Sequence, residues 1–241
     1  MPLSSIRAIT LDLDDTLWPF PPIGARIERV LDDWFRAHAP RAAERFPILA
    51  MRRLREQMIE RHPEALHDAG LLRQRYIEHA LRESGEDPAL ARPAYDAFFA
   101  ERNKVGFYAD ATAALARIAS RVPVCALSNG NADLDAIGIG HLFAGRVSAR
   151  SFGQGKPDPR IFHHACALLG VAPEETLHVG DDADTDIVGA ARAGLRTCWV
   201  HRADNRHVQW PERPIHPDLI LPDLAALADA LDEASLETAS R

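Results

Sequence analysis

The chain has 241 residues, of which 46% are hydrophobic and 26% are charged, as in an ordinary globular protein. Its net charge of −7 argues against nucleic acid as the main partner. No stretch approaches the roughly 18 apolar residues that a membrane span needs, and charged residues interrupt the N-terminal apolar stretch too early for a signal peptide. We therefore expect a cytoplasmic protein, and the sequence indicates no oligomeric state.

Cysteine usage points away from disulfides and zinc. The three cysteines, Cys125, Cys166 and Cys198, are scattered and lack CxxC spacing. Cys125 and Cys198 lie in apolar runs, so we expect them to be core residues.

The first predicted element is a strand over residues 6–11 that ends in two aspartates. The run is short and apolar at nearly every position, which is typical of a strand buried on both faces. Asp12 and Asp14 follow two positions apart, so in extended chain they project to the same side. Two carboxylates there repel one another, and a bound divalent cation would remove that penalty. This segment therefore predicts a metal site.

Residues 19–105 carry helical patterns alone. They begin at the proline-rich segment of residues 19–22 and end near Gly106. Apolar residues recur at helical spacing around residues 27–35, 49–58, 71–81 and 90–99. We predict an all-helical domain inserted into the rest of the chain.

After Gly106 the pattern changes to alternating helices and strands. Helices are predicted over about residues 110–120 and 184–194, and another begins at the N-cap Asp158 with Pro159 and ends at Gly170. Strands are predicted over residues 122–127, 176–179, 195–200 and 218–221. This alternation predicts an α/β fold with a parallel sheet.

Polar residues follow two of these strands, just as Asp12 and Asp14 follow the strand over residues 6–11. Ser128 and Asn129 come directly after the second strand, and Asp181 and Asp182 come just after the third, with Asp186 beyond. Ligands of an open parallel sheet bind outside the carboxyl ends of its strands. We therefore expect Asp12, Asp14, Ser128 and Asp181 at one edge of the sheet.

Lys156 is expected on a loop near that edge. Only two of the 28 basic residues are lysines, at positions 104 and 156. A compact ammonium fits among carboxylates and a phosphoryl oxygen as a point charge, where a planar guanidinium fits less well.

Four motifs in this order resemble the haloacid dehalogenase-like hydrolase superfamily. They are Asp12-x-Asp14-x-Thr16, then Ser128, then Lys156, then Gly180-Asp181-Asp182-x-x-x-Asp186. The resemblance implies a Rossmann-like parallel sheet core, residues 1–18 and 106–241, with an inserted helical cap domain, residues 19–105. It also implies a phosphatase that uses Mg²⁺.

The residue types together with this resemblance suggest a role for each residue. Asp12 attacks a phosphate monoester and forms an aspartyl-phosphate. The resemblance implies that Asp14 gives its backbone carbonyl to the metal, while its side chain protonates the leaving alcohol and then deprotonates the hydrolytic water. Mg²⁺ bridges Asp12, Asp181 and the phosphoryl group, and Asp186 supports this site directly or through water, with Asp182 a weaker candidate. Ser128 and the Asn129 backbone amide hold phosphoryl oxygens, and Lys156 neutralises developing charge.

Within the superfamily, the chain resembles the bacterial branch that dephosphorylates FMN and the phosphoribitylamino-uracil intermediate of riboflavin synthesis. Four stretches carry this resemblance: residues 13–17, residues 67–68 with Arg73 and Arg75, residues 129–132, and residues 178–186. His67 and Arg73 are therefore candidate specificity residues of the cap. The proline-rich segment 18–22 departs from the branch and would reshape the cap hinge. A nucleotide or sugar-phosphate phosphatase stays open.

Other reactions and classes fit less well. A haloacid dehalogenase needs neither a metal nor an acid two residues after the nucleophile, so Asp14 speaks against it. A phosphonatase would want a cap lysine for a Schiff base, and Lys104 lies at the very end of the cap. No residue points to a mutase. A phospho-accepting receiver domain places its acidic pair before the other elements and is about half as long. In this chain the last acids follow the lysine, and a helical insert splits the chain. A catalytically silent binding protein would not need every chemical position filled.

Overall fold

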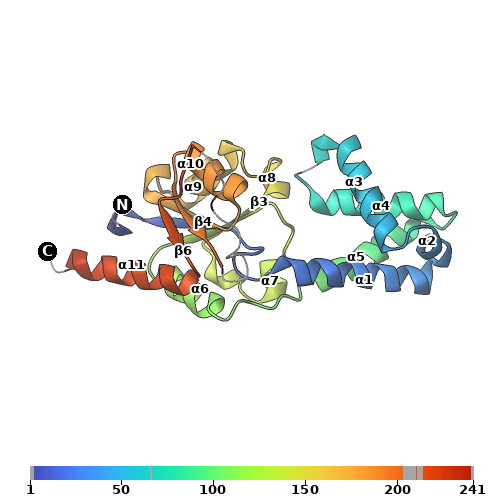
Figure 1. Ribbon diagram of the computed structural model, residues 1–241, viewed down its shortest axis with the longest axis horizontal. Coiled ribbons are helices and arrows are strands. Elements are labelled where there is room, and N and C mark those ends of the chain that lie inside the picture. Colours follow the sequence, from blue (N-terminus) through green and yellow to red (C-terminus); the bar gives the residue numbers. More distant parts are fainter. Residues whose placement is uncertain (1–2, 66, 203–209, 211–213, 240–241) are drawn as a thin grey trace. The chain divides into compact units, whose positions relative to one another are not determined.

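The structure is a computed structural model that describes residues 3–65, 67–202, 210 and 214–239 (Figure 1). It divides into two compact units. The first comprises Met1–Pro19, Gly106–Gly130 and Gly138–Arg241, and the second comprises Phe20–Val105 and Asn131–Ile137. The sequence predicted a helical domain over residues 19–105. The second unit of the structure also contains Asn131–Ile137.

A six-stranded parallel sheet forms the centre of the first unit. Its strands are β1 (Ala8–Leu11), β2 (Val124–Ser128), β3 (Gly145–Ser148), β4 (Thr176–Gly180), β5 (Arg196–Val200) and β6 (Leu219–Leu221). They lie in the order β3-β2-β1-β4-β5-β6. Every residue of β1, β2 and β4 is buried, as expected for parallel strands covered on both faces. The predicted α/β class is confirmed.

Helices cover both faces of this sheet. Figure 1 shows α9 (Pro159–Leu169) and α10 (Gly189–Arg192) on one face, and α6 (Ala111–Ala119) and α11 (Leu224–Ala239) on the other. Asp158 caps α9 by accepting from Arg160 N at 2.9 Å, and Gly170 ends that helix with a φ of 66°, as predicted. Shorter helical segments complete the unit: η1 (Leu3–Ser5), η4 (Gly140–Leu142), α8 (Ala149–Phe152), η5 (Pro173–Glu175) and η6 (Ala183–Val188).

Strand β3 was not predicted from the sequence. It lies at the edge of the sheet, and its four residues alternate between buried and more exposed positions. A strand so short, with one face partly solvated, shows no continuous apolar run. The single helix predicted over residues 184–194 is instead a π-helical turn, η6, followed by α10.

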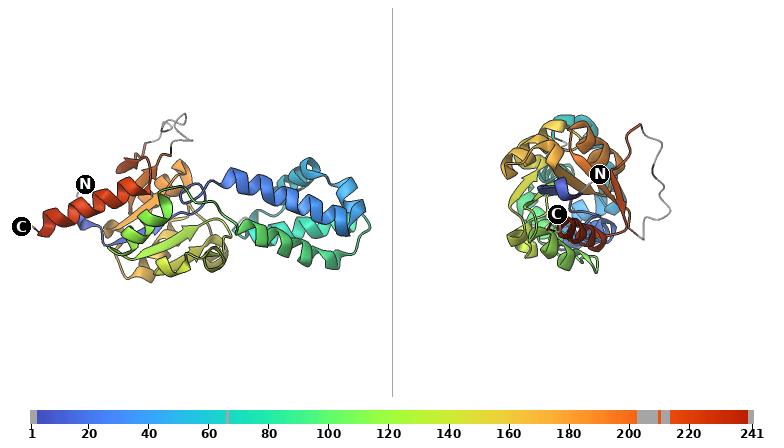
Figure 2. Two further views of the ribbon diagram at one scale, coloured as in Figure 1. Left: turned by 90° about the horizontal axis from the view of Figure 1, so that it is seen from below. Right: turned by 90° about the vertical axis from the view of Figure 1, so that its left-hand side faces the viewer.

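The second unit is helical. Its elements are α1 (Phe20–His38), α2 (Pro40–Arg45), α3 (Ile48–Arg61), η2 (Pro63–Ala65), α4 (Ala69–Glu83), η3 (Pro88–Leu90), α5 (Ala91–Arg102) and α7 (Leu134–Ile137). Figure 2 shows α1 running beside α5, which it contacts. One apolar stripe of α1, through Ile23, Ile27, Leu31 and Phe35, is buried. Among the described residues, no helix has the length and apolar character needed to cross a bilayer.

The proline-rich segment becomes helical from Phe20 onward, after Trp18 and Pro19. Pro21 and Pro22 lie in the first turn of α1, where backbone N–H groups have no partner within the helix, so proline is tolerated. The helix α2 escaped prediction because its six residues are too few to show an apolar period.

We expect Phe162→Ala to destabilise the first unit strongly. Phe162 is fully buried on α9 in a cluster with Leu127, Val147 and Ile161. Its loss should lower the free energy of unfolding by about 3–5 kcal/mol through the lost burial and the cavity left behind. Urea denaturation would measure this. Leu168→Ala, on the same helix but 52% exposed, is the matched control and should cost less than about 1 kcal/mol. Equal costs would contradict this packing.

Candidate active site

The site lies where the order of the strands reverses. Asp12 follows β1 and Asp181 follows β4, and these two strands are neighbours in the sheet. The connections from β1 and β4 lead in opposite directions along the sheet, and a parallel sheet binds its ligands at such a point. The Asp12 N–H donates to Val179 O at 2.9 Å, so the ladder is maintained up to the first aspartate.

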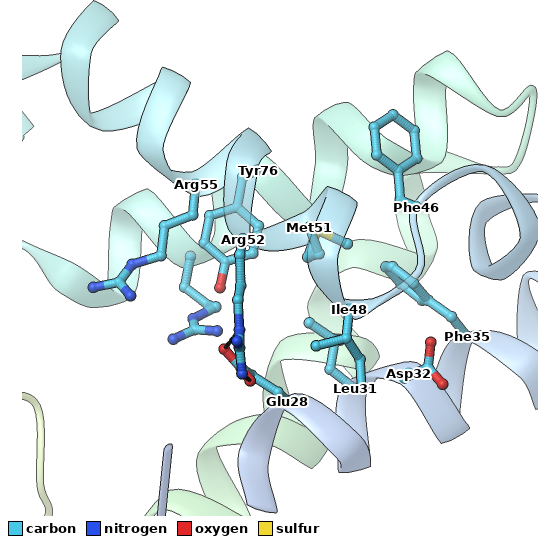
Figure 3. A pocket seen from close by; sticks show the side chains of 11 residues that line it. Glu28, Leu31, Asp32, Phe35, Phe46, Ile48, Met51, Arg52, Arg55 and Tyr76 are labelled. Atoms are coloured by element: carbon cyan, nitrogen blue, oxygen red, sulfur yellow. Dashed lines mark hydrogen bonds and ion pairs between the residues drawn. The ribbon is translucent and has the colours of Figure 1, made fainter. Parts of the chain in front are cut away.

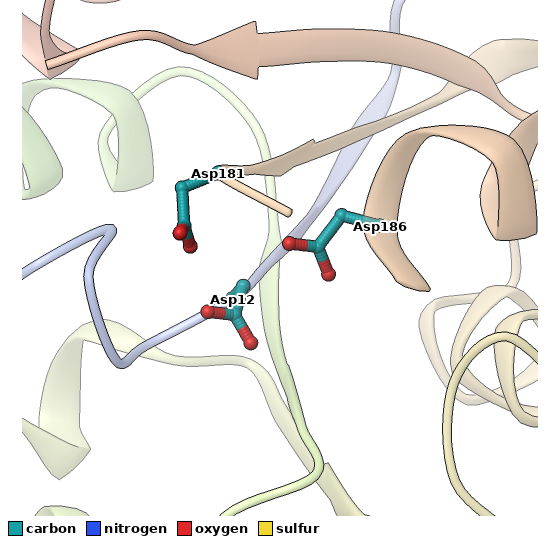
Figure 4. Close-up of side chains that lie close together, drawn as sticks. All are labelled: Asp12, Asp181 and Asp186. Carbon is teal, nitrogen blue, oxygen red and sulfur yellow. The ribbon is translucent and has the colours of Figure 1, made fainter. Parts of the chain in front are cut away.

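Three carboxylates meet here. One oxygen each of Asp12, Asp181 and Asp186 lies within 4.8 Å of the other two (Figure 4). Asp186 comes from η6, directly beyond β4. Gly180 makes this approach possible, because a Cβ at that position would lie 2.3 Å from Asp186 Oδ2. The sequence prediction listed these three acids for the metal, and the structure brings their side chains together.

Lys156 lies among these acids. Its Nζ donates to Asp12 Oδ1 at 2.5 Å and to Asp186 Oδ1 at 2.6 Å, and its side chain is only 2% exposed. The side chain of Asn129 holds the backbone of this lysine from both sides. Asn129 Oδ1 accepts from Lys156 N at 2.7 Å, and Asn129 Nδ2 donates to Lys156 O at 2.9 Å.

One lysine does not balance three acids. Burial raises the pKa of the Asp12 carboxyl well above its usual range, although Lys156 acts in the opposite direction. Burial, together with Asp186 and Asp15, raises the pKa of Asp181 to about 8. Burial would also raise the pKa of Asp186, but Lys156 and His178 lower it overall. Burial therefore works against the ionisation of Asp12 and Asp181, and a further cation would favour it.

This donor set fits a hard divalent cation. Clustered carboxylate oxygens are the ligands that Mg²⁺ prefers, and a bound cation would allow Asp12 and Asp181 to ionise. The carboxylate of Asp182 lies outside the described cluster. It instead caps η6, accepting from Asp184 N at 3.0 Å and Thr185 N at 2.7 Å.

A tight turn places Asp14 beside Trp18. Asp15 has a φ of 61°, which reverses the chain, and its N–H donates to Trp18 O at 2.7 Å. The buried indole of Trp18 then donates from Nε1 to Asp14 Oδ1 at 2.7 Å. The side chain of Asp14 is thus held apart from the three clustered carboxylates. The backbone-carbonyl role predicted for Asp14 stays a prediction.

Ser128 ends β2 and is buried. Its Oγ accepts from Gly130 N at 2.9 Å. The structure therefore brings Asp12, Lys156, Asp181 and Asp186 into direct or near contact, and it places Ser128 and Asn129 at the end of the strand next to β1. Their phosphate-binding roles stay predictions.

Several supporting residues were not identified from the sequence. Thr16 Oγ1 donates to Asp181 Oδ1 at 3.1 Å, and Trp199 Nε1 donates to Asp181 O at 2.6 Å. His178 Nε2 lies 3.2 Å from Asp186 Oδ1. Arg202 donates to Thr16 O at 2.7 Å and to Asp110 at 2.8 Å. Thr16 and His178 lie in sequence stretches that resemble the family, so these two residues could have been identified from the sequence. Trp199 and Arg202 lie in no such stretch.

The candidate specificity residues His67 and Arg73 belong to the helical unit. His67 is half-buried and precedes Asp68, whose side chain caps α4 by accepting from Leu71 N at 2.8 Å. The guanidinium of Arg73 lies 4.1 Å from the ring centre of Phe98 and 5.0 Å from that of Tyr76. Burial lowers the pKa of this guanidinium. Contact of either residue with a substrate stays a prediction.

Arg73 also lines a cavity within the helical unit, and Figure 3 shows this cavity from close by. Apolar side chains of Leu31, Phe35, Phe46, Ile48 and Met51 form one part of its lining, and the charged residues Glu28, Asp32, Arg52, Arg55 and Arg73 form another, with Tyr76. Arg52 pairs with Glu28, and Asp32 pairs with Arg36. Among the described residues, Arg55 and Arg73 have no carboxylate partner within ion-pair distance.

Comparison with known proteins gives relatives over nearly the whole chain. The family model of haloacid dehalogenase-like hydrolases matches residues 6–194. The chain is 33% identical to the 5-amino-6-(5-phospho-D-ribitylamino)uracil phosphatase YigB of Escherichia coli (strain K12), covering 95% of this chain and 98% of that protein. It is 40% identical to a phosphoserine phosphatase of Thermus thermophilus, covering 68% of this chain and 67% of that protein.

A solved structure agrees with these relatives in fold. It is titled 2-haloacid dehalogenase from Pseudomonas syringae pv. Tomato DC3000, and it superposes with a TM-score of 0.86 at 30% identity, covering 95% of this chain and 99% of that one. The family predicted from the four motifs is thereby confirmed. The chain belongs to the haloacid dehalogenase-like hydrolases.

Proposed function

We propose that the chain is a Mg²⁺-dependent phosphatase that hydrolyses a small-molecule phosphate monoester. The observation that carries this proposal is the buried cluster of Asp12, Asp181 and Asp186 around Lys156, with Asp14 two residues beyond Asp12. Similarity to relatives named as phosphatases supports the same class of reaction. The three cysteines, all free and buried, agree with the expected cytoplasmic location.

In the proposed reaction, Asp12 is the nucleophile. Its carboxylate attacks phosphorus, the bond from phosphorus to the ester oxygen breaks, and an aspartyl-phosphate forms. Asp14 gives a proton to the departing alcohol and later takes one from the water that attacks the aspartyl-phosphate. Hydrolysis then returns Asp12 and releases phosphate. Lys156, Ser128 and the Asn129 backbone amide stabilise the phosphoryl oxygens during both steps.

Asp12, Asp181 and Asp186 are the side chains that would hold Mg²⁺. When bound, this ion would neutralise charge that develops on the phosphoryl oxygens. Thr16 and Trp199 orient Asp181 through its side chain and its carbonyl, and Lys156 keeps Asp12 in place before substrate arrives.

Haloacid dehalogenation is the second candidate, because one similar structure bears that name. Displacement of a halide needs no proton donor for the leaving group and no metal. In this chain Asp14 is held in a defined position by Trp18, and two further acids accompany the nucleophile. Halide displacement has no need of either feature, so we favour the phosphatase.

For the substrate, we propose FMN or a ribityl phosphate of the riboflavin pathway. The full-length similarity to a phosphoribitylaminouracil phosphatase supports this choice. A nucleotide or sugar phosphate is the alternative. The core motifs recognise phosphate and metal alone, so the cap must discriminate among these, and His67 and Arg73 are the proposed specificity residues.

The function is tested by turnover of a metabolite panel that contains FMN, p-nitrophenyl phosphate and 2-chloropropionate. We expect the two phosphate esters to be hydrolysed with Mg²⁺ and neither to react in excess chelator, because carboxylates alone cannot hold a phosphate dianion. Asp12→Asn should abolish turnover without a covalent intermediate. Asp14→Asn should be severely impaired yet accumulate some aspartyl-phosphate. Undiminished activity in chelator, or release of chloride without phosphatase activity, would reject the proposal.

The metal site should also show in the pH dependence of stability. Folding raises the pKa of Asp181 from 3.8 to about 8, so without metal the folded chain binds more protons than the unfolded chain between these values. The stability that the Asp181 carboxyl contributes is fully present below pH 3.8 and is lost as the pH rises through about 8. Because Mg²⁺ replaces the proton, it should raise Tm more at about pH 8.5 than at about pH 6.

Asp181→Asn is the variant that isolates this effect. In chelator its Tm should fall less between about pH 6 and 8.5 than that of the unmodified chain, and Mg²⁺ should add little stability at either pH. Glu174→Gln, an exposed change on η5, is the control and should behave like the unmodified chain. A Mg²⁺ effect that persists in Asp181→Asn would contradict the assignment of this ligand.

The cap proposal predicts a change in specificity. Arg73→Met keeps an unbranched stem against Phe98 and Tyr76 but removes the charge, and His67→Ala removes the imidazole. Each should raise KM for FMN and leave hydrolysis of p-nitrophenyl phosphate nearly unchanged, because contacts to the non-reacting part of a substrate are not used by a small one. Arg53→Ala, exposed on α3, should alter neither. Equal effects on both substrates would reject the specificity role.

A further inference from the structure

His178 is a buried, polar residue that the proposed chemistry does not use. It lies on β4, two residues before Gly180, and is fully buried. Its Nδ1 is 2.8 Å from Thr10 Oγ1, and its Nε2 is 3.2 Å from Asp186 Oδ1. The ring also meets Phe162 edge-on, with centroids 5.1 Å apart and planes at 90°. It therefore links the interior of the sheet to the acidic cluster.

The partners of the imidazole define which nitrogen donates. An ionised carboxylate only accepts hydrogen bonds, so Nε2 carries the hydrogen that is donated to Asp186. In a neutral imidazole, Nδ1 is then an acceptor, and the hydroxyl of Thr10 is the donor to it. Thr10 is fully buried and stands opposite His178 in the ladder between β1 and β4. The register of these two strands thus places a hydroxyl that can donate to Nδ1, while Nε2 donates to Asp186.

This hydrogen bond completes the set that holds the Asp186 carboxylate. Oδ1 accepts from Lys156 Nζ at 2.6 Å and from His178, and Oδ2 accepts from Asp182 N at 3.0 Å. One donor comes from β4, one from the residue that precedes η6 and one from Lys156, so both oxygens of this carboxylate are held. The same Lys156 Nζ contacts Asp12 at 2.5 Å, so the orientation of Asp186 determines where the ammonium meets the nucleophile.

We propose that His178, oriented by Thr10, is a positioning residue that fixes the Asp186 carboxylate and through it the Lys156 ammonium beside Asp12. Its catalytic consequence rests on the proposed phosphatase function, whereas its effect on the acidic cluster does not. The competing explanation is that His178 only fills space against Phe162. A core residue of that kind would be replaceable by any side chain of similar volume.

Two pairs of variants separate these explanations. His178→Leu fills the space but removes both hydrogen bonds, whereas His178→Gln retains an N–H donor that reaches toward Asp186. Thr10→Val removes the hydroxyl while keeping the β-branched shape, and Thr10→Ser retains the hydroxyl. Two readouts are measured on the full chain: kcat and KM for p-nitrophenyl phosphate with saturating Mg²⁺, and the affinity for Mg²⁺ alone by calorimetry.

We expect His178→Leu to lower kcat and Mg²⁺ affinity by about 10- to 100-fold, the usual effect of removing a residue that orients a metal ligand. KM should be unchanged, because His178 touches no substrate. His178→Gln should restore most of both losses. Thr10→Val should show a smaller loss that Thr10→Ser restores, and it should add nothing in the His178→Leu background, because the two residues act through one hydrogen-bonded chain.

The outcomes are distinguishable. If the unmodified chain binds Mg²⁺ but hydrolyses no phosphate ester, the proposed function fails, and the Mg²⁺ affinities still decide the role of His178. Full kcat and Mg²⁺ affinity in a folded His178→Leu would overturn the positioning role. Equal losses of kcat and Mg²⁺ affinity in His178→Gln and His178→Leu, or in Thr10→Ser and Thr10→Val, would also overturn it. The Thr10 pair decides the matter where His178→Leu does not fold.

Discussion

The position of one ammonium among three carboxylates is the constraint on which the site depends. Lys156 is almost fully buried and contacts Asp12 and Asp186, while Asp181 lies within reach and forms no ion pair with a cationic side chain in the part of the chain that the structure describes. Taking these charges out of water is costly unless they are paired. Burial accordingly raises the pKa of Asp12 and Asp181. The proposed Mg²⁺ would offset this cost, because a bound cation favours the ionised form of both carboxyl groups.

Uncharged donors orient the acids in addition to the ion pairs with Lys156. Trp18 donates to Asp14, Thr16 donates to Asp181, and the indole of Trp199 donates to the Asp181 carbonyl. Each of these donors is uncharged and comes from a side chain packed in the first unit. A neutral donor fixes the direction of a carboxylate without competing with a metal for its charge. The cationic side chain of Arg202 donates to the Thr16 carbonyl and pairs with Asp110, and neither partner is one of the three clustered carboxylates.

The parts of the site that the sequence predicted are those that follow from local pattern and one topological rule. Buried strands are readable as apolar runs, and the acids after β1 and β4 meet because parallel strands align their carboxyl ends. The pair of Thr10 and His178 depends on the register between strands 168 residues apart, and no local pattern carries that register. Likewise, the contact between Trp18 and Asp14 requires the left-handed backbone of Asp15. An aspartate in a sequence does not predict a positive φ, whereas a glycine is typical of one.

The same features bear on why this fold would carry phosphoryl transfer here. Proteins similar to this chain are named as phosphatases and as a 2-haloacid dehalogenase, so the fold alone does not separate the two reactions. They differ in the leaving group, because an alcohol must receive a proton to depart and a halide must not. In this chain the residue two positions after the nucleophile is an acid whose carboxylate is held by an indole inside a turn. In the proposed phosphatase reaction this carboxylate transfers the proton that an alcohol needs and a halide does not, and the clustered acids beside it would hold a cation next to the anionic phosphoryl group.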